Sequence, residues 1–470
     1  MLTGMTRTLA LLLTLVATPA IADFDHFVTR DGPTLLDGDK NFRFISVNIP
    51  NYFIVEDRAT PNGSSWHRVT AFEQRDAARA VNRLGGQVLR TYTFSVEGGR
   101  NVQGKLAHIY SDNGRIRYNE ALFRDVDRGL AIAAEQNVRV IIPLVDNWAW
   151  FGGYAEWAKL AHANDFWDDP KARAAFKDFI VWLLNRRNTV TGKLYKDDPT
   201  ILAWELGNEI DKASARWITD MAAFIKQHDS NHLLMDGGHK QLVDVALQDP
   251  NIDILTTHYT DEMFDQFAQR AADAGKAYLY GEFSPAGGPQ ALREIVERTI
   301  KSPAVGSLVW SLRFRSESGG FYYHADFNNE SDSLQYPGFD TTRPHNEREI
   351  FNVLRQAAYT IQGRAIPQEA LPDAPVLLPS SNPSAINWQG SAGATGYTVQ
   401  RRQGMKGDWV SIAENVSDAI PQIDPNGGIV SALPLFGDQP GAGHWYYRVI
   451  ARNASGNSPP SNSIVIKVTH

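Results

Sequence analysis

The chain has 470 residues, of which 43% are hydrophobic and 11% aromatic, so it can bury a large core and hold one further domain. Its formal net charge of −7 is spread without a basic block, which argues against nucleic acid or an anionic membrane as partner and favours a neutral substrate. It has no cysteine, which excludes disulfides, thiol nucleophiles and cysteine-ligated metals.

Residues 1–22 predict a cleaved export signal. Arg7 precedes an apolar run from Leu9 to Ala17, and Ala20-Ile21-Ala22 has the small residues that a signal peptidase needs. Because a bilayer span needs about 20 apolar residues, this run is too short to serve as an anchor. We expect a mature chain that starts near Asp23, is secreted or periplasmic, has no membrane association and is a monomer.

From Asn41 to about Gly363, short β-rich runs alternate with segments of helical apolar spacing, an order typical of parallel strands covered by helices. Eight strands are predicted, at Phe42–Val47, Gln87–Tyr92, Val138–Val145, Ile201–Leu206, Leu233–Asp236, Ile252–Thr257, Ala277–Tyr280 and Gly306–Leu312. Eight such units without a glycine-rich nucleotide motif favour a closed (β/α)8 TIM barrel over an open sheet. We therefore assign residues 23–363 to an α/β barrel domain.

The predicted helices have local start and stop signals. Thr70 and Glu73 form a capping box, and Gly85-Gly86 ends the helix that follows. Asp169 precedes Pro170 at the start of another helix, and the last helix of the domain ends before Gly363.

A second domain is predicted after a proline-containing linker at residues 364–373. Residues 374–470 lack helical periodicity, and their strands are predicted at Ala385–Trp388, Tyr397–Arg401, Trp409–Ile412, Trp445–Ala451 and Ile464–Val468. Trp388, Tyr397, Tyr447 and the turn at residues 453–456 make this small β-sandwich resemble a fibronectin type III module. Its polar residues lie in turns, so we expect it to contribute no catalytic residue.

Two carboxylates follow barrel strands. Asn208-Glu209 ends the fourth strand and Gly281-Glu282 ends the seventh, so both glutamates should lie at the carboxyl edge where barrel active sites form. A glycosidic bond is cleaved by two carboxylates, one protonating the leaving oxygen and one acting at the anomeric carbon. Singly, Glu209 could be a helix cap and Glu282 a surface carboxylate. Their equivalent positions in one barrel favour the catalytic interpretation.

These two motifs are similar to those of clan A glycoside hydrolases, and family 5 is the closest match. Within family 5 the chain most resembles the β-mannanases, through the run from Ile142 to Trp148, Gly152-Gly153-Tyr154, and the run from Trp204 to Glu209. The resemblance covers about Phe27 to Gly363. It implies mannan endo-1,4-β-mannosidase activity. A β-1,4-glucanase and an exo-acting β-mannosidase of the same family remain alternatives.

The resemblance assigns catalytic roles, with Glu209 as acid/base and Glu282 as nucleophile. It implies that Asn208 holds the sugar 2-hydroxyl, that Arg90 orients the nucleophile, and that Trp310 lies under the sugar. Arg90 could instead form a salt bridge at the barrel rim. Glu205 lies deeper in the fourth strand, and we expect it to form a buried ion pair.

Four further aromatic or histidine residues follow or end predicted strands. The family has a histidine and a tyrosine near the nucleophile, commonly one residue apart, whereas His258 and Tyr259 are adjacent here. Tyr259 is the expected hydrogen-bond partner of Glu282, and His258 is either functional or structural. Trp148 and Trp150 follow the third strand as sugar-stacking or core residues.

Other function classes fit less well. His258 is the only histidine placed at a strand end, HExxH and GxSxG are absent, and so zinc and serine hydrolases are disfavoured; we expect neither metal nor cofactor. A carbohydrate-binding protein that has lost catalysis would not be expected to retain both glutamates. Loops Glu97–Asn119 and Arg315–Pro344 should shape the cleft for its polysaccharide or oligosaccharide partner.

A retaining mechanism sets two expectations for the glutamate pair. The two carboxyl groups should lie about 5 to 5.5 Å apart. The charge of Glu282 should raise the pKa of Glu209, while Arg90 should keep Glu282 ionised.

Overall fold

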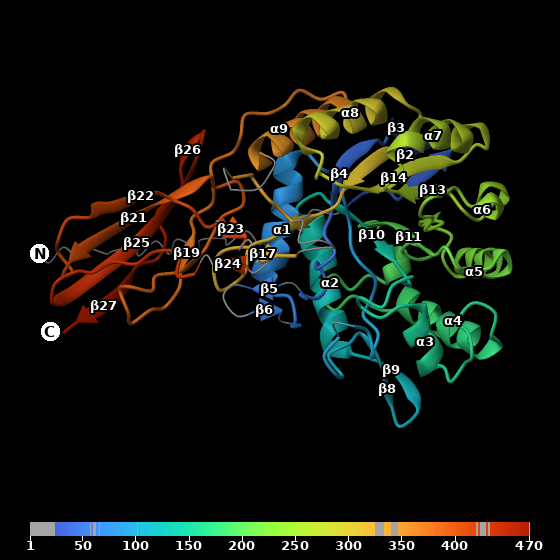
Figure 1. Cartoon of the computed structure of the whole chain (residues 1–470), viewed down its shortest axis with the longest axis horizontal. Helices are drawn as coiled ribbons and strands as arrows, with labels where there is room; N and C mark the ends of the chain where they lie inside the picture. The colour runs from blue at the N-terminus through green and yellow to red at the C-terminus, as the bar shows by residue number, and fades with distance from the viewer. Residues whose placement is uncertain are drawn as a thin grey trace, which may run out of the picture.

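The computed structural model describes residues 24–56, 58–59, 63–64, 66–100, 102–324, 333–339, 346–419, 422–423, 429–430 and 433–469. The expected signal at residues 1–22 lies outside them, as does part of the loop Arg315–Pro344. The parallel strands close into a barrel in the order β10-β11-β12-β13-β14-β15-β4-β7, which confirms the TIM barrel prediction (Figure 1). They are β4 (Phe44–Asn48), β7 (Val88–Arg90), β10 (Arg139–Pro143), β11 (Ile201–Glu205), β12 (Leu233–Met235), β13 (Ile254–His258), β14 (Ala277–Phe283) and β15 (Gly306–Val309).

The helices surround the barrel, and their starts follow the local capping signals. The Thr70 side chain accepts from the Glu73 N–H while Glu73 bonds back to Thr70, and Gly85 ends this helix at φ 88°. Asp169 accepts from the Lys171 N–H ahead of Pro170. The helices are α1 (Ala71–Leu84), α2 (Glu120–Glu135), α3 (Tyr154–Leu160), α4 (Pro170–Leu184), α5 (Ala215–His228), α6 (Asp244–Gln248), α7 (Phe264–Asp273), α8 (Gly288–Lys301) and α9 (Glu347–Ile361), with 3-10 turns at Tyr195–Asp197 and Asp261–Met263.

A hairpin closes the amino end of the barrel. Strands β1 (Val28–Asp31), β2 (Thr34–Asp37) and β3 (Lys40–Asn41) form an antiparallel sheet. Val28 and Leu35 are buried in one cluster with the first apolar residues of the barrel strands. This apolar plug leaves the carboxyl end as the polar end of the barrel.

The seventh barrel strand is longer than predicted. The sequence suggested an end at Tyr280, but β14 continues to Phe283, so Glu282 lies within the strand. Gly281 makes this possible, because a Cβ there would lie 2.5 Å from Thr256 Oγ1 and 2.6 Å from His258 Nε2. The neighbouring strands therefore pack closely at the point where Glu282 leaves the sheet.

Short strands border the carboxyl end. Strands β8 (Ile109–Asp112) and β9 (Arg115–Tyr118) form a hairpin in the loop after β7. The loops after β4 and β15 meet in a sheet of β5 (Arg58–Ala59), β6 (Gly63–Ser64) and β17 (Tyr322–Tyr323), while β16 (Leu312–Arg313) pairs with β18 (Leu334–Gln335).

The described residues after 375 form strands and no helix. One sheet contains β22 (Val410–Val416), β21 (Gly396–Gln403), β25 (Gly443–Asn453), β26 (Gly456–Asn457) and β27 (Ile464–Val468), and two short pairs are β19 (Val376–Leu377) with β20 (Trp388–Gln389) and β23 (Gln422–Ile423) with β24 (Ile429–Val430). The strand predicted at Ala385–Trp388 corresponds to β20, which begins only at Trp388, and β19 was not predicted. We call residues 376–468 the β-module.

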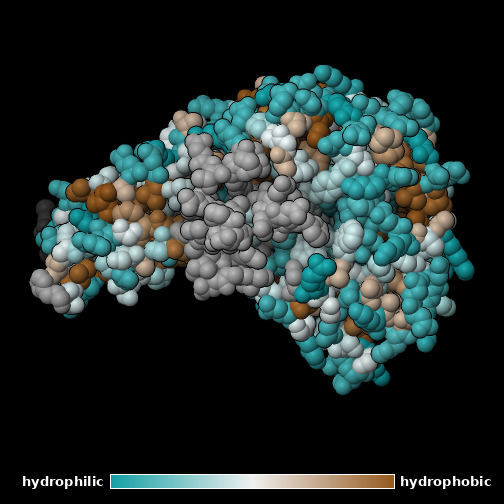
Figure 2. Space-filling view, viewed as in Figure 1, coloured by the Kyte–Doolittle hydropathy of each residue, from teal (hydrophilic) through white to brown (hydrophobic). Residues whose placement is uncertain are grey.

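The β-module extends from one side of the barrel (Figure 1). Hydrophobic side chains gather on its strands in Figure 2, and Met405, Val410 and Val465 are at least half exposed there. No helix among the described residues is long and apolar enough to cross a membrane.

A buried ion pair joins the β-module to the barrel. Arg315, in the loop after β15, lies 3.2 Å from Asp76 of α1 and 2.6 Å from Asp418 of the module. Tyr397 Oη also donates to Asp418 at 2.7 Å. All four side chains are buried, so the module covers part of the barrel surface at this junction.

Candidate active site

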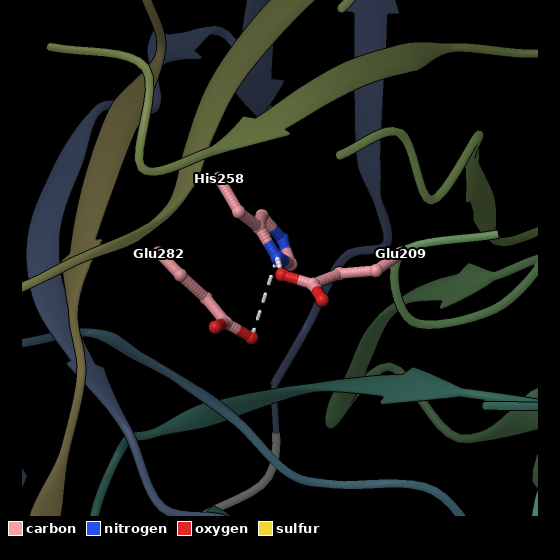
Figure 3. A group of neighbouring side chains, drawn as sticks. All are labelled: Glu209, His258 and Glu282. Carbon is pink, nitrogen blue, oxygen red and sulfur yellow. Dashed lines mark hydrogen bonds and ion pairs between the residues drawn. The ribbon is translucent and has the colours of Figure 1, made fainter. Parts of the chain in front are cut away.

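Glu209 and Glu282 meet at the carboxyl end of the barrel. They are 6% and 4% exposed, and one carboxylate oxygen of each lies within 4.8 Å of the other and of a nitrogen of His258 (Figure 3). Glu209 follows β11 with φ 55°, a left-handed conformation that turns its side chain out of the strand direction. The structure thus brings together the two carboxylates that the sequence placed at separate strand ends.

Arg90 lies beneath Glu282 at the end of β7. Its Nη1 donates to Glu282 Oε1 at 2.7 Å, and its Nε and Nη2 donate to Glu205 at 2.7 and 3.0 Å. The Arg90 and Glu205 side chains have no exposed surface. Glu205 is therefore the buried carboxylate that pairs with the arginine, and Arg90 contacts the expected nucleophile rather than forming an exposed rim bridge.

Asn208 is fixed by three neighbours. Its Oδ1 accepts from Arg90 at 2.8 Å, and its Nδ2 donates to Asp146 Oδ1 at 3.0 Å and to Tyr92 Oη at 3.3 Å. Sequence reasoning did not select Tyr92 or Asp146, although both follow barrel strands. Position after a strand end was the signal that could have found them.

His258 is buried between the two carboxylates. It is the β-ladder partner of Glu282 on the neighbouring strand, and its Nδ1 lies 2.9 Å from Glu209 Oε1 and 3.5 Å from Glu282 Oε1. Its Nε2 faces the backbone of Gly281. Although His258 and Tyr259 are adjacent in the sequence, both therefore contact the glutamates.

Tyr259, the residue after His258, contacts Glu282. Its backbone N–H donates to the Glu282 carbonyl oxygen at 2.9 Å, and its side chain forms a hydrogen bond with the Glu282 carboxylate. Tyr259 has φ 52° and is 37% exposed. It is therefore at the opening of the site, whereas His258 is at its base.

The tryptophans differ in their exposure. Trp148 is 49% exposed, which excludes core packing, and its Nε1 donates to Glu209 Oε2 at 2.6 Å, a contact that sequence reasoning did not foresee. Trp310 is 5% exposed and packs near Tyr92 and Trp150, with ring centroids 6.1 and 6.2 Å away. The Trp310 ring thus forms part of an aromatic wall beside Asn208.

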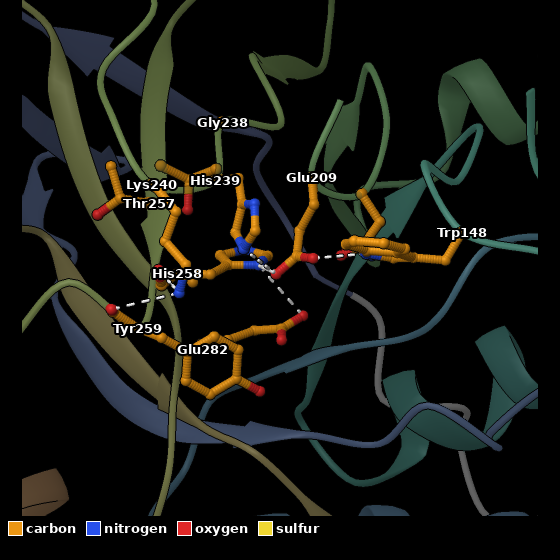
Figure 4. Close-up of polar contacts among 12 residues, drawn as sticks. Trp148, Glu209, Gly238, His239, Lys240, Thr257, His258, Tyr259 and Glu282 are labelled. Carbon is orange, nitrogen blue, oxygen red and sulfur yellow. Dashed lines mark hydrogen bonds and ion pairs between the residues drawn. The ribbon is translucent and has the colours of Figure 1, made fainter. Parts of the chain in front are cut away.

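His239 is a second histidine at Glu209. Its Nε2 lies 3.2 Å from Glu209 Oε1 (Figure 4). Its Nδ1 lies 2.7 Å from Asp211 Oδ2. The expectation that His258 is the only histidine at a strand end was wrong, because His239 follows β12 through the turn Gly237-Gly238. That glycine pair was a usable signal for a tight turn back to the barrel edge.

The protonation of the pair differs from expectation. Burial alone would raise the pKa of Glu209. Hydrogen bonds from His258 and Trp148, together with the charge of His239, outweigh burial and lower this pKa to about 2. Burial lowers the pKa of His258 to about 4, so at neutral pH this ring acts through its hydrogen bond. Burial raises the pKa of Glu282 well above its ordinary value, against the effect of Arg90. The expected raised pKa of Glu209 is therefore wrong for the site without substrate.

Glu209, His258 and Glu282 also form a group compact enough to hold a metal ion. The cationic Arg90 is 2.7 Å from Glu282 Oε1, and Glu209 Oε1 has a histidine nitrogen at 2.9 Å and another at 3.2 Å. These oxygens already have hydrogen-bond partners, and a second cation beside Arg90 would be repelled. The contacts fit a hydrogen-bonded carboxylate pair better than a metal centre.

The chain is similar in sequence and fold to known proteins. Residues 27–274 match the family described as GH family 5 beta-mannosidase-like. The chain is 32% identical over 303 residues to mannan endo-1,4-beta-mannosidase 7 of Arabidopsis thaliana, covering 53% of this chain and 68% of that protein. It is 38% identical over 168 residues to mannan endo-1,4-beta-mannosidase 1 of Oryza sativa subsp. japonica, covering 33% of this chain but only 37% of that protein.

Two solved structures share the fold. The endo-1,4-beta-mannanase from Rhizomucor miehei has a TM-score of 0.58 at 20% identity and covers 72% of this chain and 100% of its own. The endo-beta-1,4-mannanase from Thermotoga petrophila has a TM-score of 0.54 at 17% identity and covers 92% of this chain and 99% of its own. The family match over the barrel and the paired glutamates at its carboxyl end lead to one conclusion: the chain belongs to glycoside hydrolase family 5 and is a glycosidase.

Proposed function

We propose that the protein is a retaining mannan endo-1,4-β-mannosidase in which Glu282 is the nucleophile and Glu209 the acid/base. The observation that carries the proposal is that a carboxylate oxygen of Glu209 lies within 4.8 Å of one of Glu282. Inverting enzymes keep their carboxyl groups about 6.5 to 9.5 Å apart to admit a water molecule, whereas retaining enzymes keep them about 5 to 5.5 Å apart. The short distance favours direct attack by one carboxylate.

In the first step Glu282 attacks the anomeric carbon while Glu209 protonates the departing oxygen. In the second step water attacks the glycosyl-enzyme, Glu209 takes a proton from that water, and the bond to Glu282 breaks. Arg90 holds Glu282 in position and stabilises its charge at 2.7 Å. The same arginine holds Asn208, whose amide would bind the sugar 2-hydroxyl.

The pair must hold one proton for this chemistry, because two ionised carboxylates this close repel each other. In the free site burial raises the pKa of Glu282 and the donors around Glu209 lower the pKa of Glu209, so the surroundings favour the proton on Glu282. Substrate binding must then shift it to Glu209. The departing oxygen can favour this shift by taking the place of Trp148 Nε1, which now donates to Glu209 Oε2.

The substrate part of the proposal rests on the relatives. Both named plant relatives are mannan endo-1,4-β-mannosidases, and the chain spans 68% of one and 37% of the other. Half-exposed Trp148 beside Glu209 supports an open site that accepts an internal bond of a polymer, because its ring can stack on a sugar.

Product analysis tests this assignment. The protein should release short oligosaccharides from mannan and from mannohexaose, and it should act weakly on carboxymethylcellulose. Release of mannose alone would replace endo with exo action. Preference for cello-oligosaccharides, with mannan untouched, would refute the mannanase assignment.

We also propose the organisation of the rest of the chain. Residues 1–22 are a cleaved signal peptide, residues 23–363 are the catalytic domain, residues 364–373 are a linker, and residues 374–470 are a fibronectin type III-like sandwich. The buried Trp388, Tyr397 and Tyr447 of the β-module support the last assignment. We further propose export as a monomer without membrane association, which mass spectrometry of the secreted protein and light scattering would test.

A further inference from the structure

We infer that His239, held by Asp211, is a positioning residue that fixes Oε1 of Glu209 and so selects Oε2 as the oxygen that transfers the proton. The inference rests on the proposed role of Glu209. It concerns two residues that neither the sequence pattern nor the family resemblance selected.

The two oxygens of Glu209 have different surroundings. Oε1 has two imidazole nitrogens as neighbours, His258 Nδ1 at 2.9 Å and His239 Nε2 at 3.2 Å. Oε2 has Trp148 Nε1 at 2.6 Å. Figure 4 shows Trp148 on the opposite side of the carboxylate from the two histidines.

The neighbours of the two oxygens also differ in how much of their surface is exposed. His258 has no exposed surface and the His239 side chain is 13% exposed, whereas Trp148 is 49% exposed. A sugar can therefore reach Oε2 by displacing the indole N–H, whereas Oε1 lies behind buried His258 and partly buried His239. The hydrogen bond between Trp148 and Oε2 is therefore the contact that an entering substrate would replace.

Backbone contacts hold the loop that carries His239. Its carbonyl oxygen accepts from the backbone N–H of His258 at 2.7 Å, which ties the loop after β12 to β13. Gly237 has φ 76°, and a Cβ there would collide with the carbonyl oxygen of Gly207 at the end of β11. The loop is thus packed against the segment after β11 that carries Glu209.

Asp211 completes the arrangement. Its backbone N–H donates to the Glu209 carbonyl oxygen at 2.7 Å, and its carboxylate lies 2.7 Å from His239 Nδ1. The two ring nitrogens of His239 therefore have separate partners. Nδ1 is held by Asp211, and this directs Nε2 at Glu209 Oε1.

Two amide substitutions separate the functions of the two nitrogens. In His239→Gln the amide nitrogen lies near the original position of Nε2, which faces Glu209. In His239→Asn the amide lies near the position of Nδ1, which faces Asp211. Both variants are neutral and polar, so a general effect on folding should be similar in the two, and thermal melting checks this.

The readout is hydrolysis of aryl β-mannobiosides with different leaving groups, because a 2,4-dinitrophenyl group needs no proton to depart and a phenyl group does. General acid catalysis contributes about 10²- to 10⁴-fold, so partial misplacement of Glu209 should cost roughly 10- to 100-fold in kcat/KM. We expect kcat/KM of His239→Asn to fall by this roughly 10- to 100-fold on the phenyl substrate, and by less than about threefold on the dinitrophenyl substrate. His239→Gln should recover most of the loss, and Asp211→Ala should lose part of it.

His444→Ala, at an exposed histidine of the β-module, is the matched control and should change neither rate. An equal loss on both substrates, no loss on either, or the same loss in Gln and Asn variants would overturn the inference. Failure of the proposed function is seen separately, because it shows in the wild-type protein as hydrolysis of aryl β-cellobiosides with no action on the mannobiosides. The same leaving-group comparison then tests His239 on the cellobiosides.

Discussion

Two buried arginines each lie between two carboxylates, one at the candidate active site and one where the β-module meets the barrel. Arg90 lies between Glu205 and Glu282, and Arg315 lies between Asp76 and Asp418. Both guanidinium groups are at most 1% exposed. Burial and ion pairing alone therefore do not identify a catalytic arginine.

The difference lies in what the carboxylates contact next. Glu282 lies within 4.8 Å of a second carboxylate at the polar end of the barrel. Asp418 instead accepts from Tyr397 Oη inside the β-module, and Asp76 accepts from the Arg315 backbone N–H. The carboxylate at the first arginine thus lies in the candidate active site, whereas at the second every partner helps to join two domains.

The largest expected effect comes from removing Glu282, the proposed nucleophile beside Arg90. Glu282→Ala should lower kcat by about 10⁴-fold or more, because no other carboxylate can form the glycosyl-enzyme. Assays on mannohexaose measure this. Glu414→Ala, at an exposed position of the β-module, is the control, and turnover by Glu282→Ala above a hundredth of the wild-type rate would contradict the assignment.

Removing Glu209, the proposed acid/base, should slow some substrates much more than others. Glu209→Ala should lose about 10²- to 10⁴-fold on mannan, yet it should retain rapid first-step release of 2,4-dinitrophenol from an activated mannoside substrate. Azide should restore part of the turnover, because it attacks the glycosyl-enzyme without a base. If azide adds nothing and the dinitrophenyl burst is lost, Glu209 is not the acid/base.

The arginine at the junction should affect stability instead of catalysis. Asp418→Ala leaves Arg315 buried with one partner, and breaking such a pair costs about 3 to 5 kcal/mol in the free energy of unfolding. Denaturant unfolding measures this loss against Asp408→Ala, an exposed control in the same module. We expect kcat below the unfolding transition to stay within a few-fold of the wild-type value. A large fall in kcat of the folded variant would show that the junction also shapes the site.

The smallest expected effect concerns Asp236, which lies ahead of the loop that carries His239. Burial raises the pKa of Asp236 to about 7, although the Thr256 and Gly238 N–H groups donate to its Oδ1. An acid with a raised pKa contributes stability below its ordinary pKa near 4, and this contribution is lost as the pH rises towards 7.

Asp236→Asn should remove that dependence, because an amide resembles the protonated acid. Between about pH 5 and 7 the free energy of unfolding of wild type should fall by up to roughly 1.4 kcal/mol per pH unit more than that of the variant. Asp39→Asn, at an exposed aspartate, serves as the control. Parallel pH profiles for wild type and Asp236→Asn would refute the raised pKa.

The sequence predicted those parts of the site that depend on strand ends. The eight strands follow from local apolar patterns, and in a closed barrel their order determines that Glu209, Glu282, Asn208 and Arg90 meet. Trp148 was selected for its position, but its hydrogen bond to Glu209 depends on the path of the loop after β10.

Other parts depended on contacts that no local pattern encodes. His239 reaches Glu209 only because the turn at Gly237 packs against the end of β11. The pKa order of the glutamates follows from that histidine, His258 and Trp148, so it could not be derived from Arg90 and Glu282 alone. Arg315 and Asp418 are 103 residues apart, and their pairing depends on how the module docks.

The central claim is that Glu282 attacks the sugar directly, and the anomeric configuration of the first product tests it most directly. Proton NMR recorded within minutes of adding enzyme to mannohexaose distinguishes the two anomers before mutarotation equilibrates them. The account predicts that the new reducing end appears first as the β-anomer, as in the substrate. Initial appearance of the α-anomer would mean that water displaces the leaving group directly, and it would contradict the assignment of Glu282 as nucleophile.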